Sequence, residues 1–195
     1  MAQTQLTTKD RVKSLLGLSG TTHDTVIDNI INGVSAFFEG ICNRQFKSAT
    51  YADEIYDGAD SRFLFLNQFP ITALTSVYYN SGSPAVPIWT AFDVNYYVLD
   101  ARNNCIFFEA GMPIGFRNIK VTYVAGYVID FATPANHTLP YDISIVAEQI
   151  VSKIFTKRKS EGFSSESIDG ASVSYEKEMT AEQKIIISKY QKIIY

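Results

Sequence analysis

The chain has 195 residues, of which 46% are hydrophobic and 19% are charged, and its 17 basic and 20 acidic side chains give a formal net charge of −3. This composition is typical of a globular protein and excludes a disordered or fibrous chain. The small negative charge argues against a broad basic surface that would hold nucleic acid by neutralising phosphates. The sequence has no run of about 18 apolar residues, as a membrane span requires, and its N-terminus lacks the apolar core of a signal peptide. We therefore expect a protein that is made in the cytoplasm and at first stays there.

Residues 1–47 predict a pair of helices. The first is short, because Thr8 and Asp10 provide a helix start and Gly17 provides a stop. The second has the strongest helical pattern in the chain, with apolar residues at three-four spacing, namely Ile27, Ile30, Ile31, Val34, Phe37, Phe38 and Ile41.

The helical spacing of apolar residues ends before residues 48–129. In this section short runs rich in Tyr, Val, Phe and Thr alternate with turn residues. This alternation is typical of strands and hairpins. Residues 95–99 (NYYVL) and 105–109 (CIFFE), separated by DARNN, predict a hairpin, and residues 118–128 (NIKVTYVAGYV) predict a half-buried strand that ends near Gly126.

Helical spacing returns after the β section. Pro140 suits the start of a helix within residues 130–160, and Thr180 with Gln183 predicts a capping box for a last helix over residues 180–195. A polar loop over residues 161–179 separates the two. We therefore predict an α+β fold in a single domain, residues 1–195: a mainly helical bundle, made of the N-terminal helix pair and two C-terminal helices, with an inserted antiparallel β section.

The sequence carries no pattern of an enzyme, a metal site or a cofactor site. The two histidines, His23 and His137, have no ligands at metal spacing, and Cys42 and Cys105 form no Cys-x-x-Cys pair. One acidic cluster lacks the spacing of a calcium loop and is better explained by a turn at Asp57-Gly58; its members are Asp53, Glu54, Asp57 and Asp60. We predict no catalytic residue, no metal and no cofactor.

The polar stretch of residues 161–178 is unusual inside a compact domain, because connections of this length are most often functional or disordered. It holds five acidic residues and one lysine. Ile168, Val173 and Tyr175 are spaced so that they offer one edge of a strand to a partner. We therefore predict that this stretch orders against another subunit or a neighbouring protein, and that the last helix docks as well. The predicted partner-facing residues are Ser165, Glu166, Ser167, Ile168, Val173, Tyr175, Ile186, Tyr190, Ile193 and Ile194.

Several short motifs occur in a characteristic order. Cys-Asn-Arg-Gln-Phe at residues 42–46 follows the helix pair, and Tyr-Asp-Gly at residues 56–58 precedes a leucine-rich strand and a proline. Val-Thr-Tyr-Val-Ala-Gly-Tyr at residues 121–127 is followed by Pro-Tyr-Asp at residues 140–142. Ser-Glu-Ser-Ile-Asp-Gly-Ala-Ser-Val-Ser-Tyr occupies residues 165–175. In this order the motifs resemble the head-tail connector, or adaptor, proteins of long-tailed bacteriophages and related gene-transfer particles. The sequence departs from that pattern at Asp169-Gly170, where Gly-Asp is usual, and in its longer β section.

The resemblance implies a structural virion protein that forms a ring, commonly of twelve copies, beneath the portal of a filled capsid. Such a ring would join the portal to a tail-completion or stopper protein, line the channel and touch passing DNA only passively, without contacting a membrane. An alternative from another class is a nucleic-acid-associated module that uses the Lys-Arg-Lys run at residues 157–159 and exposed tyrosines.

Overall fold

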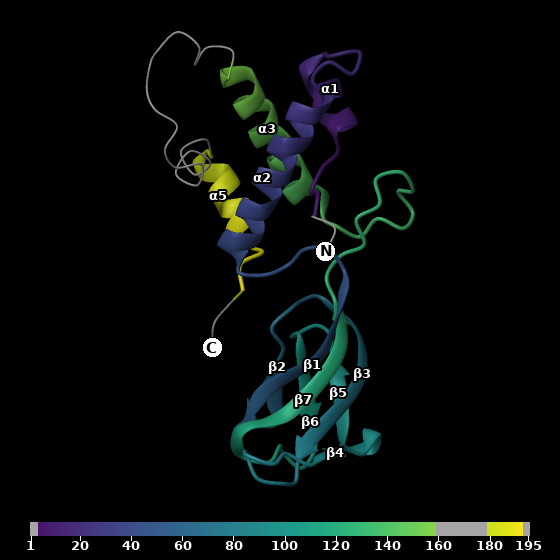
Figure 1. Ribbon diagram of the computed structural model, residues 1–195, viewed down its shortest axis with the longest axis vertical. Helices are drawn as coiled ribbons and strands as arrows, with labels where there is room; N and C mark the ends of the chain where they lie inside the picture. The colour runs from purple at the N-terminus through teal and green to yellow at the C-terminus, as the bar shows by residue number, and fades with distance from the viewer. Residues whose placement is uncertain (1–3, 159–178, 193–195) are drawn as a thin grey trace. The chain divides into compact units, whose positions relative to one another are not determined.

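The computed structural model describes residues 4–158 and 179–192, and this part of the chain divides into two compact units. Met1–Phe46 together with Val128–Tyr195 make up the helical unit, and Lys47–Tyr127 make up the β unit. Figure 1 shows the helices α1, α2, α3 and α5 and the strands β1 to β7. Among the described residues, no helix is both long enough and apolar enough to cross a membrane.

Four described helices form the helical unit. They are α1 (Lys9–Leu16), α2 (Asp24–Cys42), α3 (Tyr141–Lys157) and α5 (Ala181–Ser188). The predicted signals are confirmed: Thr8 caps α1, Gly17 ends it, and Thr180 with Gln183 forms the capping box of α5. The last helix is shorter than expected, because it ends at Ser188 and the backbone N–H of Lys192 instead bonds to the carbonyl of Cys42 at 2.9 Å.

The core of the helical unit lies where α2 packs against α3. Both helices bury apolar side chains at helical spacing, so each contributes one stripe; the buried residues are Ile27, Ile31, Val34 and Phe38 of α2 with Ile143, Val146, Ile150 and Phe155 of α3. The helix α1 is fixed to α3 by an ion pair between Arg11 and Glu148, whose carboxylate also accepts a bond from the Thr7 hydroxyl at 3.1 Å.

The β unit consists of two antiparallel sheets. The larger has the order β1-β7-β3-β4, from β1 (Ala49–Gly58), β7 (Gly115–Ala125), β3 (Ile71–Asn80) and β4 (Trp89–Ala91). The smaller has the order β2-β6-β5, from β2 (Phe63–Phe65), β6 (Cys105–Phe108) and β5 (Tyr97–Asp100), with a 3-10 turn at Val94–Tyr96. The predicted hairpin is therefore confirmed as β5-β6, in which Val98 pairs with Phe107.

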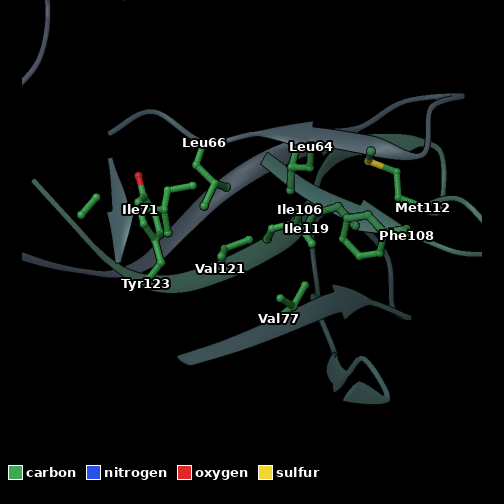
Figure 2. Packing of buried hydrophobic residues seen from close by; sticks show 11 residues of the cluster. Leu64, Leu66, Ile71, Val77, Ile106, Phe108, Met112, Ile119, Val121 and Tyr123 are labelled. Atoms are coloured by element: carbon green, nitrogen blue, oxygen red, sulfur yellow. The ribbon is translucent and has the colours of Figure 1, made fainter. Parts of the chain in front are cut away.

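The two sheets share one apolar core. Figure 2 shows its side chains gathered between the strands. They are Leu64, Leu66, Ile71, Val77, Ile106, Phe108, Met112, Ile119, Val121, Tyr123 and Ala125. The fold is α+β, as predicted, but the expectation of a mainly helical bundle is wrong. The β section is a two-sheet unit with its own core, and in its larger sheet the long strand β7 pairs with both β1 and β3.

Candidate partner-binding site

The predicted partner-facing residues fall into two groups in the structure. Ile186 and Tyr190 lie on and just after α5 in the helical unit. The others, Ser165, Glu166, Ser167, Ile168, Val173, Tyr175, Ile193 and Ile194, lie outside the described residues. The partner-facing role of both groups stays a prediction.

The helix α5 packs on its own chain along one face. Gln183 donates to the Gln149 side chain of α3 at 2.8 Å, and the Tyr190 hydroxyl donates to the Asp142 carboxylate. Ile187 is only 2% exposed, and its carbonyl accepts a weak bond from the Cys42 thiol at 3.8 Å. These contacts fix the rotation of the helix about its axis.

The opposite face of α5 is open. Ile185, which no sequence motif marks, is 61% exposed, whereas Ile186 is half-buried. Residues 185–187 are three consecutive isoleucines, so the sequence alone does not indicate which of them faces the core. In the structure Gln183 and Ile187 contact the rest of the helical unit, and Ile185 is therefore the isoleucine that points away from it.

A pocket of about 210 Å³ opens between α2 and α5. Its lining consists of Ile41, Met179, Lys184, Ile187 and Gln191. Figure 1 shows α5 beside α2, and their contact is internal to the helical unit. The pocket is largely apolar, with an ammonium and an amide as its polar groups, and so it suits an apolar side chain with acceptors beside it.

The acidic residues that the sequence places together are separated in the β unit. The Asp53 carboxylate pairs with Lys120 at 3.4 Å, whereas the Asp57 carboxylate accepts the backbone N–H of Arg117 at 2.6 Å. In the described part of the chain, no group of three His, Cys, Asp or Glu residues converges in the way that a metal ion needs. The expected turn at Asp57-Gly58 is wrong, because both residues belong to β1, where Gly58 pairs with Gly115 of β7.

Glu54 has a different role, because its carboxylate accepts hydrogen bonds from two tyrosine hydroxyls. Tyr123 donates to it at 2.8 Å and Tyr56 donates to the same oxygen. The same hydroxyls accept backbone N–H groups, from Gln68 to Tyr123 and from Asn67 to Tyr56, both at 3.1 Å. The cluster therefore attaches the chain after β2 to the large sheet, and it has the satisfied hydrogen bonds of a structural network.

The tyrosine cluster makes the β unit sensitive to alkali. Burial raises the pKa of both Tyr56 and Tyr123 well above the ordinary value, and hydrogen bonding to Glu54 adds to the effect. A raised pKa in the folded state means that stability is fully present below pH about 10 and is lost as the pH rises further. We expect the free energy of unfolding to fall by up to about 1.4 kcal/mol per pH unit for each tyrosine.

Urea unfolding at pH 8, 10 and 11, followed by the fluorescence of the single tryptophan Trp89 in β4, measures this loss. Tyr123→Phe should cost about 1–3 kcal/mol at pH 8, because it removes a buried donor to Glu54, and should flatten the alkaline decline. Tyr96→Phe, at a ring that is 54% exposed, is the control and should change stability by less than about 0.5 kcal/mol. An alkaline decline of equal slope in Tyr123→Phe and the unsubstituted protein would contradict this role.

The comparison with protein families decides what kind of protein this is. The family model described as head completion protein matches residues 5–193, which is nearly the whole chain. The chain belongs to the head completion protein family. The resemblance to head-tail connectors that the motifs indicate is thereby confirmed at the level of the family.

Solved structures show that this head completion protein shares its fold with chains of phage-like particles. One is a chain in the neck of an empty GTA particle, computed with C6 symmetry: the TM-score is 0.55 at 11% identity, over 95% of this chain and 89% of that one. Another, from the virion of a native gene transfer agent (GTA) particle, has a TM-score of 0.51 at 11% identity, with the same coverage of both chains. No curated protein matches the chain. At such low identity the structural matches establish the fold.

Proposed function

We propose that this head completion protein is a structural component of the virion neck, where identical copies form a ring beneath the portal and join the DNA-filled capsid to the tail. The observation that carries the proposal is the family match over residues 5–193. A fold shared with a chain in the neck of a GTA particle supports it. Twelve copies, a portal above, a tail-completion or stopper protein below and passive contact with passing DNA complete the proposed arrangement.

The surface of the chain is suited to assembly. Ile114 and Phe116, at the start of β7, are 73% and 69% exposed, and Ile185 of α5 is also largely exposed. Exposed apolar side chains that lie together commonly mark contacts with partners, whereas single ones are normal on a protein surface. In a closed ring each copy uses two different surfaces, and the same weak contact repeated around the ring gives strong attachment in total.

The mass of the protein in solution, measured with and without purified portal, tests this proposal. We expect the addition of portal to convert the chain into a complex whose mass corresponds to a ring of copies on one portal. The same measurement with a portal whose tail-facing surface is removed is the control. A chain that keeps the same mass in every mixture would contradict a neck role.

Three of the side chains that the alternative, a nucleic-acid-associated module, would use are engaged within the chain, although the rings of Tyr96 and Tyr141 are 54% and 53% exposed. The Arg158 guanidinium lies over the Phe155 ring at 4.1 Å. The Tyr78 ring is covered by the Lys120 ammonium at 5.0 Å, and the Tyr79 ring packs edge-on against Phe92, also at 5.0 Å. We expect no measurable DNA binding in a salt titration; micromolar affinity that falls steeply with salt would favour the alternative.

A further inference from the structure

The pocket between α2 and α5 is suited to receive another segment of protein. Ile41, Met179 and Ile187 supply its apolar lining, while Lys184 and Gln191 supply its polar groups. Ile187 is 2% exposed, and the hydrogen bond of its carbonyl with Cys42 ties α5 to α2. The pocket is therefore built from residues that the fold already holds in place.

The charge around this pocket favours an acidic occupant. None of the five lining residues is acidic. Residues 180–192 carry three lysines, Lys184, Lys189 and Lys192, against one carboxylate, Glu182. An apolar side chain flanked by carboxylates would thus satisfy both the lining and the surrounding charge.

One segment of this chain has that composition. Residues 161–178 contain five acidic residues and one lysine, and Ile168 stands between Glu166 and Asp169. Val173, the other large aliphatic residue of the segment, has serine on both sides. We propose that Ile168 of one copy fills the pocket between α2 and α5 of the adjacent copy, with Glu166 and Asp169 facing Lys184.

This assignment rests on the proposed ring, because it requires adjacent copies. Ile168 is ten residues beyond Arg158, the last described residue before the segment, and an extended chain spans about 3.3 Å per residue, or roughly 33 Å in total. Length alone therefore does not decide between the pocket of a neighbouring copy and that of the same chain, and the choice of a neighbour comes from the proposed ring. A head-to-tail ring needs a donating and a receiving surface on each copy, which the segment and the pocket provide.

Crosslinking between two differently tagged chains tests the assignment. One chain carries Ser167→Cys, which keeps Ile168, and the other carries Gln191→Cys at the pocket; both are mixed, assembled on portal and treated with a short bismaleimide. We expect a product that joins the two tags. Background from the native thiols is low because Cys42 and Cys105 are buried, and burial raises the pKa of the Cys42 thiol to about 11.

Two matched variants make the result specific. Ile185→Cys, on the open face of α5 and outside the pocket lining, replaces Gln191→Cys and should give no product. Adding Ile168→Asp to the Ser167→Cys chain should abolish the product, and an excess of unsubstituted chain in this mixture allows rings to form even though the substituted copies have lost the contact.

Rings of normal mass without the product, or with equal product at Ile185→Cys, would overturn the assignment. So would a product found only within a single chain that carries both Ser167→Cys and Gln191→Cys, since the segment would then fill its own pocket. If the unsubstituted chain forms no ring with portal, the proposed function itself fails and the assignment fails with it.

Discussion

Gly126→Ala is expected to lower the free energy of unfolding of the β unit by on the order of 3 kcal/mol. Gly126 follows β7 and has a φ of 105°, a conformation that side chains with a Cβ rarely adopt. A Cβ at this position would lie 2.7 Å from the carbonyl oxygen of Lys47 and 2.9 Å from the Cα of Ser48. Both atoms are backbone, so the clash cannot be relieved by rotating a side chain.

The backbone around Gly126 cannot move away cheaply either. The N–H of Gly126 donates to the carbonyl of Pro70 at 2.9 Å, and the N–H of Ser48 donates to the carbonyl of Tyr127 at 2.8 Å. A shift that accommodates the new methyl group would therefore strain the entry to β1 and the entry to β3 together. Chemical unfolding followed by Trp89 fluorescence reports this loss directly.

Gly40→Ala is the matched control for that experiment. Gly40 lies in α2 and is exposed, and a methyl group added there would meet no heavy atom within 4 Å beyond the adjoining backbone of its own helix. The same chemical change should therefore raise the free energy of unfolding of the helical unit by about 0.5–1 kcal/mol, through helix propensity, which circular dichroism follows, and should leave the Trp89 transition of the β unit unchanged. Gly126→Ala with a stability within about 0.5 kcal/mol of the unsubstituted protein would contradict the backbone argument.

Local sequence signals predicted the parts of this fold that are stabilised locally. The capping box at Thr180 and the stop at Gly17 depend on neighbours within a few residues, so both could be recognised in the sequence. The β5-β6 hairpin also depends on a short turn. In each case the residues that signal the element are the residues that form it.

The strand pairings that build the β unit join residues far apart in the sequence. Tyr51 of β1 pairs with Tyr123 of β7, and Val77 of β3 pairs with Val121 of the same strand. Alternation indicates that such segments are strands, but it does not indicate which strands meet across many residues. This is why the sequence indicates an inserted β section but not that this section forms a unit with its own core in a fold that is not mainly helical.

The candidate site also has features that local sequence signals indicate and features that depend on tertiary contacts. The apolar character of the last helix was evident in the sequence, and Ile186 and Tyr190 were predicted from it. The exposure of Ile185 and the pocket that Ile41 helps to form depend on how α5 packs on α2 and α3. Tertiary contacts of this kind leave no periodic pattern in a helix as short as α5.

Deletion of residues 164–178 is expected to abolish attachment to portal while both units stay folded. The fold should survive because α5 is held by contacts outside the deleted stretch, from Gln183 to Gln149 and from Tyr190 to Asp142. Gln149 lies eight residues before the end of α3, or about 12 Å along the helix, so the chain must return by roughly that distance. The five residues that remain, 159–163, span up to about 17 Å and can make this connection.

Attachment should be lost because the deletion removes the acidic segment that we propose each copy uses to engage its neighbour. Circular dichroism and the Trp89 unfolding curve check the fold, and co-sedimentation with portal checks attachment. A variant with residues 164–178 in scrambled order keeps the length, charge and composition, and we expect it to fold normally and to attach as poorly as the deletion. Attachment that persists in the deletion variant would show that the ring is held by other surfaces, such as Ile114 and Phe116 of the β unit. Scrambled chains that attach normally, beside a deletion that does not, would reduce the role of the segment to its length, charge and composition.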